Sequence, residues 1–185
     1  MHVQVFTTGG TIDKVYFDAR SAFEVGEPLV ADLFRQAGVA FPFDVEVLFR
    51  KDSLDLTDAD RALVADRVAA CDADRVIVTH GTDTMAETAR AVAARLAGPA
   101  GGPGGAAKTV VFVGSLAPAR FKASDAEFNV GFAAAAVQAL GPGVYVAMNG
   151  RVFDPETVRK DRAGNRFTDD PAPPEPAAAV RPAPL

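Results

Sequence analysis

Short, unbroken apolar runs rich in β-branched residues constrain the fold of this chain more than any other feature. The clearest runs are residues 75–79, 109–114 and 144–148. They lack the alternation of apolar and polar residues seen in strands with one solvent-facing side, and this is typical of strands buried on both faces of a parallel sheet. Two further strands are predicted at residues 3–7 and 45–49. The sequence therefore predicts a mainly parallel sheet covered by helices.

Helix signals lie between these predicted strands. Pro28 and Gly38 suit the first turn and the end of a helix over residues 29–36. Three more helices are predicted where a hydroxyl residue is followed three positions later by an acid, the pattern of a capping box, which should be weakest where the acid is Asp. The pairs are Thr57 with Asp60, Thr84 with Glu87, and Ser124 with Glu127. The alternation predicts a single α/β domain with a doubly wound sheet of the Rossmann or flavodoxin type.

Three stretches carry no such pattern. Residues 11–27 are expected to form a long loop, a feature that is uncommon and often functional. Residues 98–105 are rich in Gly and Pro and are expected to be a flexible surface connection. The Pro/Ala-rich residues 171–185 predict a disordered tail, which leaves residues 1–170 as the folded domain.

Composition narrows the classes of function. The chain has 185 residues, a formal net charge of −5 and no cluster of Lys and Arg, which argues against a nucleic-acid partner. Its one cysteine, Cys71, excludes an internal disulfide framework, fits a reducing compartment and is expected to be an inert packed thiol. The first residues show no secretion signal, and no apolar run is long enough to cross a membrane. We therefore expect a cytoplasmic protein.

Two threonine-bearing segments, residues 7–13 and 79–85, each follow directly on a predicted strand. Each therefore places hydroxyl groups at the carboxyl end of a strand, where open α/β sheets bind their ligands. Hydroxyls that converge with a carboxylate suggest nucleophilic chemistry on a small polar substrate. The sequence has no phosphate-binding loop, no dinucleotide fingerprint and no ligand spacing typical of zinc, so we expect no cofactor and no metal.

Residues in both segments have a functional and a structural interpretation. Thr11 could be a nucleophile with Tyr16 as the nearest proton acceptor, or it could simply cap the tight turn that the preceding glycines form. Asp83 is either a solvated charge at a helix start or a carboxylate facing the crevice, where it needs a cationic partner such as a lysine or a substrate ammonium. His80 is expected to be a hydrogen-bonded structural residue rather than a metal ligand.

The same segments resemble the two signatures of the bacterial-type L-asparaginases, in the N-terminal domain of that family. Residues 8–12 match the first signature, and residues 80–85 match the second residue for residue. Residues 113–129 are similar to the family's next strand and helix, and residues 148–160 correspond to the stretch that carries its catalytic lysine. These matches occur in the family's order from about residue 3 to residue 161.

The resemblance implies roles for individual residues. Thr11 would be the nucleophile and Tyr16 its activator, while Thr82, Asp83 and Lys160 would form a second, triad-like catalytic group. The implied substrate-binding positions are Ser53, Gly10, Gly81, Asp83 and Ser115. Thr11 would attack the side-chain amide carbon, ammonia would leave, and water would hydrolyse the acyl-enzyme, with backbone amides beside the glycines as oxyanion donors.

The implied function is hydrolysis of L-asparagine to L-aspartate and ammonia, with Ser53 binding the substrate α-carboxylate and Asp83 its α-ammonium. The sequence departs from longer relatives because no second domain follows within these residues, and because Leu54 and Phe23 replace a glutamine and a tyrosine. We therefore expect weak substrate binding, little glutaminase activity, and a homo-oligomer such as a dimer. Two alternatives stay open: an amino-acid-binding or regulatory domain with little catalysis, and an amidase for another small amide.

Overall fold

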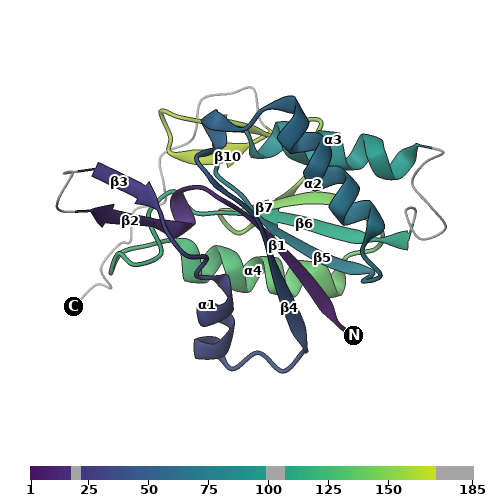
Figure 1. The fold of residues 1–185 in the computed structure, drawn as a ribbon, viewed down its shortest axis with the longest axis horizontal. Helices are drawn as coiled ribbons and strands as arrows, with labels where there is room; N and C mark the ends of the chain where they lie inside the picture. The colour runs from purple at the N-terminus through teal and green to yellow at the C-terminus, as the bar shows by residue number, and fades with distance from the viewer. Residues whose placement is uncertain (18–21, 99–106, 170–185) are drawn as a thin grey trace, which may run out of the picture.

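A six-stranded sheet forms the centre of the computed structural model, which describes residues 1–17, 22–98 and 107–169 (Figure 1). In spatial order the strands are β4 (Phe43–Lys51), β1 (Val3–Gly9), β5 (Arg75–Thr79), β6 (Thr109–Val113), β7 (Gly143–Met148) and β8 (Arg151–Phe153). The first five are parallel, and β8 runs antiparallel to β7 at the edge. The predicted mainly parallel sheet is confirmed, with strand ends that differ from the prediction by no more than two residues.

Helices lie on both faces of this sheet. Figure 1 shows α2 (Asp58–Ala70) and α3 (Met85–Ala97) on one face, and α1 (Val30–Ala37) and α4 (Ala126–Ala139) on the other. α1 ends at Gly38, whose φ of 63° is the left-handed conformation that closes many helices. The doubly wound arrangement predicted from the sequence is therefore confirmed.

The central strands β5 and β6 are the most completely buried part of the sheet. Val76, Ile77 and Val78 of β5 are inaccessible to solvent, and every residue of β6 is buried. Full burial of one such aliphatic side chain contributes about 1.5–3 kcal/mol to stability. Because helices cover both faces, these strands need no polar side and appear in the sequence as unbroken apolar runs.

The region after β1 differs from the sequence prediction. Residues 11–27 are not a structureless loop: they contain a 3-10 helix, η1 (Thr11–Asp13), and an antiparallel hairpin of β2 (Lys14–Phe17) and β3 (Ala22–Val25). The hairpin projects away from the main sheet (Figure 1) and forms a two-stranded sheet of its own. Such short strands, without a face on the core, leave no clear period in the sequence, and for this reason the loop prediction is wrong.

The three predicted capping boxes also differ from the prediction in which of them forms its hydrogen bonds. Only Thr57 with Asp60 forms both reciprocal hydrogen bonds of a capping box, although an Asp pair was expected to be the weakest. Thr84 is the N-cap of α3, but its hydroxyl donates to the backbone oxygen of Ser53 at 2.8 Å. Ser124 accepts a hydrogen bond from the backbone N–H of Ala126 and precedes the true N-cap of α4. In α3, the Thr84 hydroxyl that the local pattern assigned to the helix end is therefore used in a tertiary hydrogen bond.

A second short hairpin, β9 (Arg159–Asp161) with β10 (Arg166–Thr168), follows β8. Asn149 at the end of β7 holds this hairpin in place. Its side-chain oxygen accepts a hydrogen bond from the backbone N–H of Phe167 at 2.9 Å, and its own N–H donates to the Asn129 side chain in α4 at 3.2 Å. The hairpin is therefore fixed to the main sheet and to a helix.

Two predicted flexible stretches cannot be compared with the structure, since residues 99–105 and 171–185 lie outside the described residues. Cys71 is half-buried at the end of α2 and packs against the core, with its Sγ 3.3 Å from the backbone oxygen of Val68. Within the described ranges, no helix has both the length and the apolar character needed to span a membrane.

Candidate active site

The two threonine-bearing segments meet beyond the carboxyl ends of β1 and β5. Gly10 has a φ of 89°, and a Cβ atom there would overlap the backbone of Gly81. A Cβ atom on Gly81 would in turn lie 2.7 Å from the Ser53 hydroxyl oxygen. Glycine is needed at both positions because no side chain fits and, at Gly10, because positive φ is strained for other residues. The fold thus brings Gly10, Gly81 and Ser53 into close contact.

A lysine from late in the chain joins the second segment. Lys160 Nζ donates to Thr82 Oγ1 at 2.7 Å and lies 3.2 Å from Asp83 Oδ1. Thr82 and Asp83 occupy the turn between β5 and α3, whereas Lys160 belongs to β9. The cationic partner expected for Asp83 is therefore present. A hydroxyl, a carboxylate and an ammonium within hydrogen-bonding distance can exchange a proton.

A second cation reaches the same carboxylate, and the sequence reasoning did not identify it. Arg162 Nη2 lies 2.8 Å from Asp83 Oδ1, the oxygen that also contacts Lys160. The Arg162 side chain is 71% exposed, compared with 19% for Lys160. The sequence gives no signal for this contact, because Arg162 lies in the turn after β9 (Arg159–Asp161) and not in the strand itself.

The Thr11 hydroxyl, unlike that of Thr82, has no hydrogen-bond partner among the described residues. Thr11 begins η1 and is partly exposed. Tyr16, its expected activator, is 52% exposed and packs edge-to-face on Phe23 across the β2–β3 hairpin, with ring centroids 5.4 Å apart. Phe23 also contacts Phe121, at a centroid distance of 5.9 Å. The structure therefore positions Tyr16 by aromatic packing and not by a hydrogen bond to Thr11.

Asp13 connects the Thr11 turn with the base of the hairpin. Its buried carboxylate accepts a hydrogen bond from the backbone N–H of Leu29 at 3.0 Å, and its backbone oxygen accepts one from Gly26 at 2.8 Å. Its other carboxylate oxygen has no partner among the described residues. Burial raises the pKa of this carboxyl to about 6, although the Leu29 hydrogen bond and the positive charge of Arg120 act in the opposite direction.

The two candidate serines differ in availability. Ser53 begins the 3-10 helix η3 (Ser53–Asp55), is buried beside Gly81, and its hydroxyl forms no hydrogen bond within the described ranges. The Ser115 hydroxyl donates to the backbone oxygen of Ala117 at 2.6 Å. Ser53 therefore offers a free hydroxyl to a ligand, whereas the Ser115 hydroxyl is used within its own loop.

His80 is a structural residue, as expected. Its imidazole is fully buried, with Nδ1 2.8 Å from the backbone oxygen of Gly81 and Nε2 2.8 Å from the Thr88 hydroxyl. Burial lowers the pKa of this imidazole to about 4, so it is neutral at pH 7. Across the described residues, no group of three or more His, Cys, Asp or Glu side chains could hold a metal ion.

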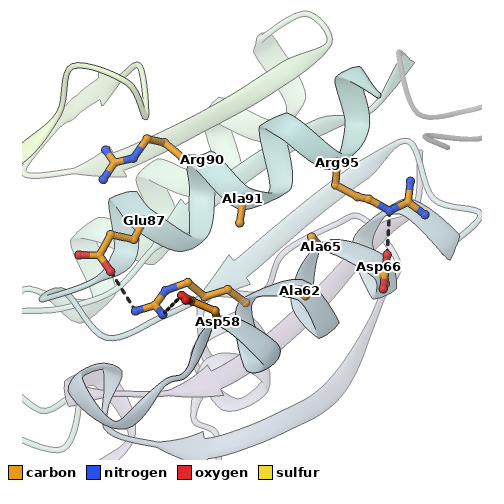
Figure 2. A pocket seen from close by; sticks show the side chains of 9 residues that line it. Asp58, Ala62, Ala65, Asp66, Glu87, Arg90, Ala91 and Arg95 are labelled. Atoms are coloured by element: carbon orange, nitrogen blue, oxygen red, sulfur yellow. Dashed lines mark hydrogen bonds and ion pairs between the residues drawn. The ribbon is translucent and has the colours of Figure 1, made fainter. Parts of the chain in front are cut away.

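A groove between α2 and α3 offers different chemistry (Figure 2). Arg61 pairs with Asp58 at 3.0 Å and with Glu87 at 2.9 Å, and Arg95 pairs with Asp66 at 2.7 Å. The remaining lining consists of alanines and Arg90, whose guanidinium donates to a backbone oxygen. No hydroxyl or thiol lines this groove, so it supplies no nucleophile. The place where the two threonine-bearing segments meet is therefore the better candidate for an active site.

The chain also matches a known protein family. The family model described as "Asparaginase, N-terminal" matches residues 2–180 of this chain. The chain is 30% identical over 169 residues to a Haemophilus influenzae protein named "Probable L-asparaginase periplasmic", a match that covers 86% of this chain and 46% of that protein.

Solved structures with the same fold give a consistent result. L-asparaginase I from Vibrio cholerae aligns with a TM-score of 0.76 at 28% identity, over 94% of this chain and 52% of its own. The thermostable L-asparaginase from Thermococcus kodakarensis aligns with a TM-score of 0.75 at 24% identity, with the same coverage, and at that identity it shows the fold alone. The chain therefore spans about half the length of the relatives it matches.

Proposed function

Since this chain belongs to the asparaginase family, we propose that it hydrolyses the side-chain amide of L-asparagine to give L-aspartate and ammonia. The observation that carries the proposal is the contact of Lys160 Nζ with both Thr82 and Asp83, at 2.7 Å and 3.2 Å. A buried hydroxyl without catalytic use does not require a lysine and a carboxylate beside it. Gly81, the residue before Thr82, lies against Gly10, the residue before Thr11, and this closeness supports a site shared by Thr11 and the Lys160 group.

In the proposed reaction the Thr11 oxygen attacks the amide carbon of the substrate and its proton passes to a base. Tyr16 is the proposed base, and Thr82 with Lys160 moves the proton to the leaving nitrogen. The carbon–nitrogen bond then breaks, ammonia leaves, and an ester joins Thr11 to the aspartyl group. Water attacks this ester, which releases L-aspartate and restores the Thr11 hydroxyl. Backbone N–H groups beside the glycines stabilise the oxyanion in both steps.

Substrate recognition in this proposal rests on two groups of opposite character. The free Ser53 hydroxyl donates to the substrate α-carboxylate, and Asp83 accepts the α-ammonium. Gly10 and Gly81 contribute backbone and allow the ligand to approach closely. The Ser115 hydroxyl is already bonded to Ala117, so its proposed contribution is the shape of the crevice wall.

The test is ammonia release from L-asparagine by the purified protein, compared with Thr11→Ala. The substitution removes the nucleophile, and we expect a loss of at least about 10³-fold in kcat. Thr11→Ser keeps a hydroxyl at the same position and should retain measurable activity. If the unsubstituted protein and Thr11→Ala are equally inactive while L-asparagine still binds, the chain is an amino-acid-binding domain. Turnover of another amide but not of L-asparagine would identify a different amidase.

The same assay measures the remaining sequence expectations. We propose a Michaelis constant in the millimolar range, at or above about 1 mM. We also propose little glutaminase activity, because one extra methylene moves the amide carbon away from attack geometry. Comparable turnover of L-glutamine and L-asparagine would contradict the second proposal.

We further propose that the protein acts in the cytoplasm as a homo-oligomer. A single cysteine is compatible with a reducing compartment. Size-exclusion chromatography with light scattering measures the assembly, and cell fractionation measures the location. A monomer, or recovery outside the cytoplasm, would contradict the respective proposal.

A further inference from the structure

Asp83 carries more positive charge around it than a site for a cationic ligand should. Lys160 Nζ and Arg162 Nη2 both contact Asp83 Oδ1, at 3.2 Å and 2.8 Å. One carboxylate is therefore shared by an ammonium group and a guanidinium group. The local formal charge of these three groups is positive before any substrate ammonium arrives.

The two cations have different structural roles. Lys160 is mostly buried and also donates to Thr82, so it belongs to the catalytic group. Arg162 lies in the turn after β9, is 71% exposed, and pairs only with Asp83 among the described residues. An exposed ion pair of this kind contributes little to stability, in the range of about 0–1 kcal/mol. The position of Arg162 is therefore better explained by its effect on Asp83 than by a role in folding.

We propose that Arg162 is a specificity-determining residue that competes with the substrate α-ammonium for Asp83. Bound L-asparagine must either displace the guanidinium or place its own positive charge beside it, and both options cost affinity. A substrate whose α-amino group is acylated has no positive charge at that position and does not incur this cost. Arg162 therefore weakens binding of the free amino acid selectively. This inference rests on the proposed function, in which Asp83 receives the ammonium.

The experiment measures binding in place of turnover. Dissociation constants for L-asparagine and for N-acetyl-L-asparagine are determined by ligand-observed NMR with Thr11→Ala protein, which leaves both ligands intact. The same constants are measured after adding Arg162→Gln. We expect Arg162→Gln to tighten L-asparagine binding about three- to tenfold, the range for loss of one partly screened like-charge contact. Binding of N-acetyl-L-asparagine should change by less than about twofold.

Two further variants separate the local effect from net charge. Arg162→Lys keeps the positive charge and should bind both ligands as the parent does. Arg67→Gln removes the same charge from the last turn of α2, where Arg67 pairs with Glu46, and should leave both constants unchanged. Circular dichroism confirms that each variant is folded.

Several outcomes would overturn the inference. L-asparagine affinity that is unchanged or weaker in Arg162→Gln would do so, as would an equal change for both ligands, or no L-asparagine binding to either protein. Ammonia release by the unsubstituted protein is recorded in parallel. If it is absent while Arg162→Gln tightens L-asparagine binding, the proposed hydrolysis is wrong and the inference stands. If it is present while both constants are unchanged, the inference alone is wrong.

Discussion

The two threonine-bearing loops lie side by side, with Gly10 against Gly81, but their hydroxyl groups are held in opposite ways. In the loop after β5, the Thr82 hydroxyl accepts a hydrogen bond from Lys160, and Asp83 is paired with two cations. In the loop after β1, the Thr11 hydroxyl has no hydrogen-bond partner among the described residues, and Tyr16 is half exposed on a separate hairpin. One loop is complete without ligand, whereas the other is not.

The difference follows from what holds each loop. The Thr82 loop is fixed by contacts between elements of the main sheet and the β9–β10 hairpin, which Asn149 ties to that sheet. The Thr11 loop continues into the β2–β3 hairpin, and it is attached by the hydrogen bonds of Asp13 to Leu29 and Gly26 and by that of Ile12 to Ala119. Charge placed by a rigid framework costs no reorganisation during reaction. We propose that Thr11, which lies in η1 directly before this hairpin, adjusts its position as the substrate binds.

The largest expected effect, on kcat, comes from a substitution beside the Thr82 loop. Lys160→Met removes the ammonium that contacts Thr82 and Asp83, so the proposed proton transfer to the leaving nitrogen loses its donor. We expect kcat for L-asparagine to fall by about 10²–10⁴-fold. Steady-state ammonia release gives kcat and KM separately. A kcat near that of the unsubstituted protein would remove Lys160 from the catalytic group.

Lys160→Arg is the matched variant for this prediction. Arginine keeps the charge beside Asp83 but does not lose a proton at any ordinary pH. If Lys160 transfers a proton, Lys160→Arg stays slow. Full activity in Lys160→Arg would instead show that a fixed positive charge is sufficient.

A smaller effect, on stability, is expected from a substitution that pushes the two threonine-bearing loops apart. Gly10→Ala places a Cβ atom against the backbone of Gly81 at a position with a φ of 89°. Overlap and backbone strain together should lower the free energy of unfolding by about 3–4 kcal/mol. Urea denaturation followed by circular dichroism measures this change. Gly131→Ala in α4 is the control, because no atom lies within 4 Å of its added Cβ, and it should not destabilise the protein.

The smallest effect concerns the attachment of the Thr11 loop. Asp13 has a pKa of about 6 in the folded protein, against 3.8 for an unperturbed aspartate. Between these values the unfolded chain has lost the proton and the folded protein still binds it, so stability falls as pH rises through this window. The loss attributable to Asp13 is about 3 kcal/mol at most, and is complete above the folded pKa.

Asp13→Asn keeps the acceptor for Leu29 but cannot ionise. The difference in unfolding free energy between the unsubstituted protein and Asp13→Asn should therefore shift in favour of Asn from pH 4 to pH 7. Urea titrations at several pH values measure the difference. Parallel pH curves for the two proteins would show that this carboxyl does not titrate as its burial implies.

The sheet was predictable because its central strands have one dominant requirement. Burial on both faces selects β-branched apolar residues in β5 and β6, and nothing in the sequence competes with that signal. The approach of Lys160 to Asp83 was predictable in part, because a carboxylate facing a crevice needs a cation. Its identity came from the family resemblance and not from spacing.

The missed features depend on contacts that a local pattern does not contain. The β2–β3 hairpin has no face on the core, so the alternation of apolar and polar residues typical of a half-buried strand is absent from its sequence. Asp13 is buried by Leu29 and its neighbours, and an acidic residue beside a glycine turn gives no sign of that burial. Arg162 resembles any surface arginine until the fold brings β9 to the start of α3.

The contact of Lys160 with Thr82 spans 78 positions in the sequence. During synthesis the strands β1 and β5 and both threonine loops leave the ribosome before the lysine does. A nascent chain that has reached α4 already contains the proposed nucleophile Thr11 and Ser53, but not Lys160, the last member of the group proposed to move protons. Such long-range contacts form late, because the cost of closing the chain must be met first. The newly made protein therefore contains its proposed binding residues before its proposed catalytic group is complete.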